Sequence, residues 1–432
     1  MTRARWRTRV QPIFVGAALA TSVLLFTTAL PLGAGQDPVR KAVPAGARYE
    51  AAVARGREVL ESLVRGGRTP GVSVAVALGG TIVWSEGFGH ADLEKRLPVT
   101  PATLFGIGSL SKTLTMAGVL TLVDAGLLDL DAPIETYLPD FPHKGKGITL
   151  RRLAAHQSGL SDEFAAAHYL TDRHFATIEE AYREIVARET IAYQPGSKVQ
   201  YGTGLYTIIG RVMEAVAKRP YLNVMKERVF DRAGLTGVVP NDRTARIPLR
   251  TEFYVERAGG GFDKAPFFDP SHKLPGAGFL ASAGDMARFG AALLRPGLLT
   301  DRARAEMRRA VPLADGRSTE YALGLQVGEF EGQPMLHLPG GGPGISAWLF
   351  LHPADDLVVA LLSNVATGPV GGRTHAEIAR AFRRATRTGG SEAKEREACR
   401  RPRYDAGHLR SRVFPPEAEL NRPLSPAGRP KP

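Results

Sequence analysis

Strand-forming segments gather in two groups far apart in the sequence, and this distribution restricts the fold more than any other feature. VSVAVAL (residues 72–78) and TIVWSEGF (81–88) are joined by Gly79-Gly80, a pair that is typical of a tight hairpin turn. The second group contains four short segments, at residues 322–327, 334–338, 346–351 and 357–362. The sequence therefore predicts one sheet built from both ends of the folded chain.

Apolar residues at helical spacing predict helices before, between and after the two strand groups. One run covers residues 49–64 and ends at Gly66-Gly67, and a second, apolar stretch covers 110–123 and is followed by Gly126. Further helices are expected at residues 203–217, 282–294 and 374–386. The fold class is therefore α+β: an antiparallel sheet flanked by N- and C-terminal helices, with a mostly helical insertion and a cleft where the two parts meet.

The chain of 432 residues shows no internal repeat and no long linker before residue 385, which favours one large domain over residues 45–386. Its formal charge of +13 is concentrated at the ends, where residues 1–41 and residues 386–432 carry +5 each and leave +3 for the rest. A phosphate-binding surface needs cations clustered on the folded part. We therefore expect no nucleic-acid partner.

Both ends of the sequence differ from the predicted domain. Residues 1–35 combine four arginines, an apolar run from 13 to about 32 and small residues up to Gly35, which is typical of a signal peptide or of an uncleaved membrane anchor. Either form predicts export to the periplasm or the extracellular space, and the second predicts membrane association. Residues 387–432 form a basic, proline-rich tail that we expect to be disordered. This tail contains the single cysteine, Cys399, so neither an intrachain disulfide nor thiol catalysis is expected.

The segment LFGIGSLSKTLT, residues 104–115, places Ser109 three residues before Lys112 at the predicted start of a helix. A lysine one helical turn away lies on the same face as the serine, and burial lowers the pKa of an amine towards the range where it accepts a serine proton. The same spacing occurs at Ser391 and Lys394 in the tail. The spacing alone therefore leaves open an ordinary pair of polar residues on one helix face.

Several further motifs follow this serine in a defined order. They are ITLRRLAAHQSGL (148–160), PGSKVQYGTGLYTIIGRVMEAV (195–216), GAGFLASAGDMARFGAALL (276–294) and PGGGPGISAWLFLHP (339–353). In this order and spacing, the chain resembles the serine β-lactamase and penicillin-binding-protein superfamily over residues 72–385. It resembles the class C β-lactamase-like serine hydrolases in particular, and its pattern is similar to the mitochondrial β-lactamase-like serine protease subgroup.

The resemblance assigns roles to the residues that match the family motifs. Ser109 would be the acylated nucleophile, Lys112 its proton partner, and Tyr201 a phenol that moves a proton between serine and leaving group when cations lower its pKa. The backbone amides of Ser109 and Gly341 would form the oxyanion hole. His156, in the AAHQSGL motif, is expected to hold the loop structure rather than to react.

Two positions depart from the family pattern. Thr203 stands where most members have asparagine, and its hydroxyl can still bond to Lys112 but lacks the amide that would also hold a substrate carbonyl. On the strand that edges the cleft, Leu338 occupies the position of the family's cation, with His337 one residue earlier. Either a bulge turns His337 inward as a catalytic or binding residue, or the site lacks this cation and recognises a substrate carboxylate weakly.

The sequence contains no glycine-x-serine-x-glycine elbow, HExxH pair, phosphate loop or dinucleotide fingerprint, so we expect no cofactor and no metal. The residues and the resemblance together predict an exported serine hydrolase that forms an acyl-enzyme on a small-molecule or peptide substrate. The substrate would be an amide or ester: a D-amino-acid peptide, another peptide, a small ester or, less efficiently, a β-lactam. Thr203 and Leu338 keep open an alternative, a catalytically weak, envelope-anchored binding or scaffolding protein. The oligomeric state stays open.

Overall fold

The computed structural model describes residues 46–366, 370–371 and 373–388. The predicted signal peptide or anchor at residues 1–35 and nearly all of the predicted tail lie outside these residues. Within them, none of the helices combines the length and the apolar character that crossing a bilayer requires.

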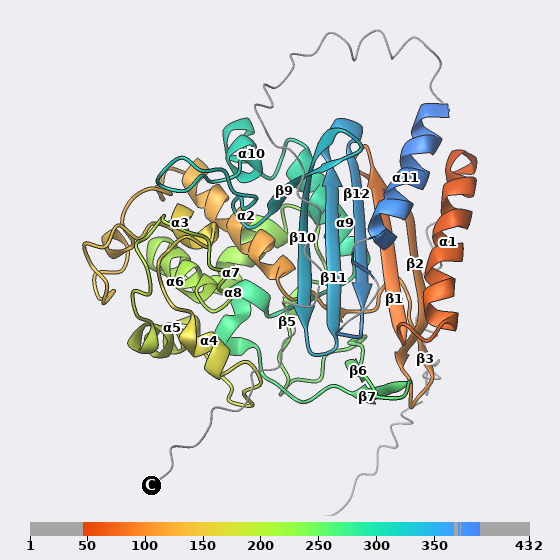
Figure 1. The fold of residues 1–432 in the computed structure, drawn as a ribbon, viewed down its shortest axis with the longest axis horizontal. Coiled ribbons are helices and arrows are strands. Elements are labelled where there is room, and N and C mark those ends of the chain that lie inside the picture. The colour runs from red at the N-terminus through yellow and green to blue at the C-terminus, as the bar shows by residue number, and fades with distance from the viewer. Residues whose placement is uncertain (1–45, 367–369, 372, 389–432) are drawn as a thin grey trace, which may run out of the picture. The chain divides into compact units, whose positions relative to one another are not determined.

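A seven-stranded antiparallel sheet forms the centre of the described structure (Figure 1). Its strand order is β3-β2-β1-β12-β11-β10-β9, so that β1, from the start of the domain, pairs with β12, from its end. The sheet predicted from both chain ends is confirmed, and the predicted hairpin joins β1 to β2. Its strands are β1 (Gly71–Leu78), β2 (Thr81–Asp92), β3 (Leu97–Pro98), β9 (Gln326–Phe330), β10 (Gln333–Gly342), β11 (Ile345–His352) and β12 (Leu357–Ser363).

The central strands are buried on both faces because their alternate residues enter two different cores. In β1, the valines of VSVAVAL pack towards the terminal helices α1 (Glu50–Arg65) and α11 (Arg373–Thr388). The alanines of the same strand pack on the opposite face, against α9 (Ala283–Leu294). Gly290 lets α9 approach the sheet closely, since a side-chain carbon at this position would lie 2.6 Å from Val358.

Helix α2 (Leu110–Asp124) lies at the centre of the helical insertion. Every residue from 110 to 122 is buried, so the helix contacts protein on all sides and holds the residues at its start rigidly. Around it lie η2 (Ile134–Thr136), α3 (Leu150–Ala154), α4 (Glu163–Ala167), α5 (Ile178–Arg188), α6 (Tyr206–Ala217), α7 (Tyr221–Met225), η3 (Lys226–Phe230), η4 (Ser271–Lys273), α8 (Leu274–Ala277) and α10 (Asp301–Arg308). The remaining short elements are β4 (Phe105–Gly106), β5 (Val239–Pro240), β6 (Tyr254–Glu256), β7 (Phe262–Lys264), β8 (Phe279–Ala281), η1 (Ala47–Tyr49) and η5 (Pro353–Asp355).

Two elements start three or more residues later than the sequence predicts. The helix expected from Thr203 starts three residues later, as α6, and a loop takes its place. The strand expected at residues 322–327 starts only at Gln326, because the chain before it turns tightly at Gly324 (φ +73). The carbonyl of Gly324 accepts a hydrogen bond from Thr113 Oγ1 of α2 at 2.6 Å, which holds this turn against the helix.

Candidate active site

Ser109 lies directly before α2, at the end of a turn that glycine adopts more readily than other residues. Gly108, in this turn, has φ +49 and connects β4 to the helix. One helical turn further on, Lys112 donates a hydrogen bond from Nζ to Ser109 Oγ at 3.1 Å. The two residues therefore form a contacting pair, and the alternative of two independent polar side chains on a helix face does not hold.

The amine of Lys112 is fully buried and has three acceptors from three separate segments. Besides Ser109 Oγ, Nζ donates to Thr203 Oγ1 and to Gly276 O, each at 3.1 Å. Three acceptors match the three N–H bonds of a lysine ammonium. Burial still lowers the pKa of Lys112 from its ordinary value of 10.5 to about 7, so the neutral amine is well populated near neutral pH.

Tyr201 contacts the same serine and remains accessible to solvent. Its hydroxyl donates to Ser109 Oγ at 2.8 Å, and Lys112 Nζ lies 4.7 Å from the centre of its ring. The expectation that cations lower its pKa is wrong, because the protein around Tyr201 shields part of the phenol from water and raises the pKa to about 12. With 37% of its surface exposed, Tyr201 is a protonated donor that a substrate can reach at neutral pH.

The ring of Tyr201 rests on His156, as expected for a residue that holds the loop. The two ring centres lie 4.2 Å apart, and His156 Nδ1 accepts the N–H of Gly202 at 3.3 Å. The carbonyl of His156 accepts the N–H of Gln200 at 2.8 Å. Burial lowers the pKa of this imidazole, so it stays neutral and can accept the Gly202 hydrogen bond.

The end of β10 contacts the turn that precedes Ser109. A side-chain carbon at Gly340 would lie 2.1 Å from Ile107 O, and one at Gly108 would lie 2.8 Å from Gly341 N, so only glycines permit this approach. A side-chain carbon at Gly341 would meet no atom within 4 Å, so this residue borders open space. The amide of Gly341 is thus held against the turn that carries Ser109.

Asp162 is a residue of this site that the sequence reasoning missed. Its Oδ2 accepts the N–H of Thr203 at 2.9 Å, which fixes the loop that presents Thr203 Oγ1 to Lys112. Its Oδ1 is buried as well, and burial raises the pKa of the carboxyl to about 7. When ionised, Asp162 favours the ammonium form of Lys112 and opposes the effect of burial. The one signal in the sequence is its place two residues after HQSGL.

The inward bulge, one of the two alternatives for His337, does not form. The pairing of β10 is regular on both sides, where His337 lies opposite Phe350 of β11 and Gln326 of β9. Its ring stacks on Trp348 with centres 5.4 Å apart, and Trp348 stacks in turn on His375 of α11 at 4.5 Å. Strand alternation has therefore turned His337 towards the terminal helices.

Leu338 consequently occupies the side of β10 that faces α2, where it packs in the same core as Leu110 and Leu114. Burial lowers the pKa of His337 to about 4, so the imidazole is neutral as well as turned away. Of the two alternatives drawn from the sequence, the structure supports the second: β10 presents no cation at this position.

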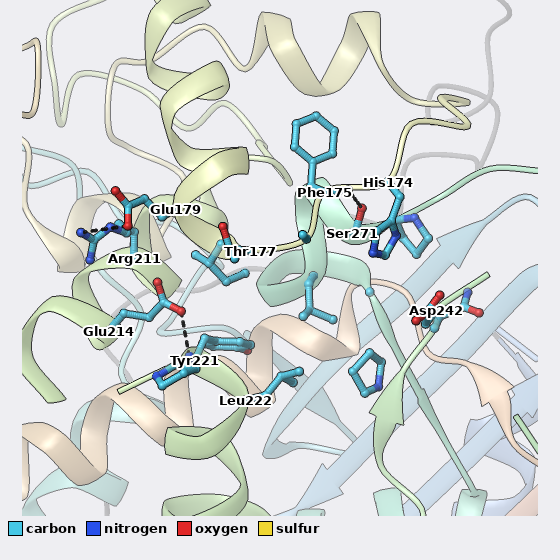
Figure 2. A pocket seen from close by; sticks show the side chains of 18 of the residues that line it. His174, Phe175, Thr177, Glu179, Arg211, Glu214, Tyr221, Leu222, Asp242 and Ser271 are labelled. Atoms are coloured by element: carbon cyan, nitrogen blue, oxygen red, sulfur yellow. Dashed lines mark hydrogen bonds and ion pairs between the residues drawn. The ribbon is translucent and has the colours of Figure 1, made fainter. Parts of the chain in front are cut away.

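A separate cavity of about 530 Å³ lies among α5, α6, α7 and α8 (Figure 2). Its lining includes His174, Arg211 and Glu214, and Glu214 accepts the N–H of Tyr221 at 2.9 Å. None of the six residues predicted for the site lines this cavity. In the part of the chain that the structure describes, no group of three or more His, Cys, Asp or Glu side chains is arranged to hold a metal ion.

Comparison with known proteins connects this geometry to a family. The Beta-lactamase family model matches residues 57–383. The human serine beta-lactamase-like protein LACTB is 28% identical over 331 residues, which cover 60% of this chain and 59% of the relative. A D-aminopeptidase from Gluconobacter oxydans is 29% identical over 263 residues, covering 60% of this chain and 48% of the relative. The chain thus spans about half to three fifths of the length of these two relatives.

Solved structures show the same fold. The D-amino acid amidase from Ochrobactrum anthropi SV3 superposes with a TM-score of 0.68 at 21% identity, over 77% of this chain and 99% of the amidase. The fold class predicted from the sequence is confirmed. Since the family model covers most of the sequence, the resemblance inferred from the motifs is also confirmed, and the chain belongs to the Beta-lactamase family.

Proposed function

We propose that the chain is a serine hydrolase that cleaves an amide or ester through an acyl-enzyme on Ser109. The observation that carries this proposal is the pair of hydrogen bonds on one hydroxyl oxygen, from Lys112 Nζ at 3.1 Å and from Tyr201 at 2.8 Å. A serine needs a neighbouring base to become a nucleophile, and the lowered pKa of Lys112 supplies one near neutral pH.

In the acylation step, neutral Lys112 accepts the proton of Ser109 while Oγ attacks the substrate carbonyl carbon. The amides of Ser109 and Gly341 donate hydrogen bonds to the oxyanion that forms. Tyr201, which is protonated, donates its proton to the departing amine or alcohol, and the proton held by Lys112 restores the phenol. Water then attacks the acyl-enzyme by the reverse path and releases the acid.

The substrate follows from what the walls of the site offer. Because β10 carries Leu338 at the position of the family's cation, a carboxylate on that side finds no partner, and β-lactams should be poor substrates. Relatives and structural neighbours include proteins named D-aminopeptidase and D-amino acid amidase, which supports amides as reactive groups.

A fluorophosphonate probe tests the proposal directly. We expect it to label the purified protein and not Ser109→Ala. Ser391→Ala, in the second serine-x-x-lysine match, is the matched control and should label like wild type. Hydrolysis of D-alanyl dipeptides, peptides, p-nitrophenyl esters and nitrocefin would then define the substrate. Absence of labelling and of hydrolysis would favour the alternative, a binding or scaffolding protein.

We also propose that the chain is exported, on the composition of residues 1–35, which lie outside the described residues. Mass analysis of the amino terminus from membrane and soluble fractions tests this. An intact Met1 on protein found in the cytosolic fraction would contradict both the cleaved and the anchored form.

A further inference from the structure

A second buried lysine, Lys273, lies close to the catalytic candidates. It ends η4, three residues before Gly276, whose carbonyl accepts a hydrogen bond from Lys112. Only 5% of Lys273 is exposed. Burying an ammonium is costly unless hydrogen bonds or an opposite charge compensate it, so its partners are informative.

The contacts of Lys273 leave its ammonium incompletely satisfied. Its Nζ donates one long hydrogen bond, to Tyr169 O at 3.4 Å, and lies 4.4 Å from the centre of the Tyr169 ring and 5.8 Å from that of Phe268. Among the described residues, no carboxylate forms an ion pair with it within 4.0 Å. An ammonium has three donors, so two of them face aromatic rings or no acceptor at all.

Residues of the candidate site influence the pKa of Lys273. Burial and the nearby Lys112 lower its pKa, Asp162 raises it, and the result is about 8, so the side chain is largely protonated at neutral pH. The main chain links the two lysines, because Gly276, the acceptor of Lys112 Nζ, follows Lys273 by three residues. Lys273 is therefore a cation of the helical insertion, close in the chain to a residue that bonds to Lys112.

Two exposed, largely apolar side chains lie at the segment that covers Lys273. Tyr169, which covers the ammonium, is 49% exposed, and Leu170 is 51% exposed. An acyl chain that ends in an acid group could therefore lie along these side chains and reach the ammonium. A carboxylate would supply the short, charge-assisted hydrogen bonds that Tyr169 O alone does not provide.

We infer that Lys273 forms an anion subsite for the acyl part of the substrate, so that the preferred substrates are amides or esters of acids carrying a second carboxylate. This inference rests on the proposed function for its catalytic readout. Such a subsite would supply, from the helical insertion, the cation that β10 lacks.

Paired substrates test the inference. Hydrolysis rates are measured on the mono-p-nitrophenyl esters of succinic, glutaric and adipic acid and on the corresponding methyl p-nitrophenyl diesters, in which the second carboxyl is neutral. The rate measured with Ser109→Ala is subtracted from each. In Lys273→Gln, which keeps a donor for Tyr169 O but loses the charge, kcat/KM for the best acidic ester should fall about 10- to 100-fold. The rate on its methyl diester should stay within about twofold. Lys226→Gln, at an exposed lysine paired with Asp231, is the control and should change neither rate.

Binding separates failure of the subsite from failure of the hydrolase. Glutarate, measured by calorimetry, should bind Ser109→Ala at least about tenfold more tightly than Ser109→Ala/Lys273→Gln. If the wild type hydrolyses neither ester, the proposed hydrolase fails, and the glutarate comparison still decides the subsite. Equal loss of rate on both esters, or equal glutarate binding by the two proteins, would show that Lys273 only anchors the Tyr169 loop.

Discussion

Burial of Lys112 predicts how kcat/KM depends on pH. With the ordinary pKa of 10.5, only about one Lys112 in 3,000 would be neutral at pH 7. Burial lowers the pKa to about 7, so about half of the molecules hold the base form at that pH. We therefore expect kcat/KM for p-nitrophenyl butyrate to rise about tenfold between pH 6 and pH 8 and then to level off.

Asp162→Asn perturbs this profile in a defined direction. The ionised carboxylate favours the ammonium of Lys112, so its removal lowers the pKa of Lys112 further. Asparagine keeps an oxygen that can accept the N–H of Thr203, which preserves the loop. The rising limb should therefore move to lower pH, by about one unit for a partly ionised neighbour.

The assay is kcat/KM between pH 5.5 and pH 9 for wild type, Asp162→Asn and the control Asp231→Asn, an exposed carboxylate paired with Lys226. The control should follow the wild type. If the wild-type rate keeps climbing tenfold per pH unit to pH 9, Lys112 has an ordinary pKa and the reasoning fails. A shift of the Asp162→Asn profile to higher pH would refute the assigned direction of the charge effect.

Three further predictions concern substitutions of single residues. Tyr201→Phe removes the 2.8 Å hydrogen bond to Ser109, and we expect kcat/KM to fall about 10²- to 10⁴-fold on amides and less on p-nitrophenyl esters, whose leaving group needs no proton. Gly340→Ala should lower the melting temperature strongly, because the new carbon meets a carbonyl at 2.1 Å, whereas Gly341→Ala, which meets no atom within 4 Å, should leave it nearly unchanged. His337→Leu should keep kcat/KM within about threefold, since this side chain packs on the other face of the sheet; a larger loss would place it in the reaction.

The fold could be predicted from the sequence where local pattern and tertiary environment agree. VSVAVAL predicts a strand because β-branched residues alternate with small ones, and the structure uses this alternation to fill two cores. The apolar spacing continues back to Thr203 and predicts a helix from there, whereas α6 begins only at Tyr206. In the folded chain, Asp162 accepts the N–H of Thr203, and this contact between distant segments holds a loop there.

For the candidate site too, some residues could be predicted from the sequence and others could not. Ser109 and Lys112 could be paired from their spacing, because three residues are one helical turn. Asp162 and Lys273 could not, because their roles depend on which distant segments fold against them. His337 is a different case: the alternation rule already separated it from Leu338, and the regular pairing of β10 confirms that rule over the bulge.

The stability of the domain and its proposed chemistry make opposite demands on Lys112. A buried amine whose pKa is lowered from 10.5 to about 7 destabilises the fold fully below pH 7, and this penalty disappears as pH rises towards 10.5, where the unfolded lysine also loses its proton. The three acceptors at Ser109, Thr203 and Gly276 offset part of that penalty. A fourth, charged partner in direct contact would remove it but would also raise the pKa and eliminate the base. Asp162 accepts a hydrogen bond from the backbone of Thr203 and acts on Lys112 only through its charge, without direct contact. The destabilisation by the buried amine is therefore reduced while its pKa stays low enough for it to act as a base.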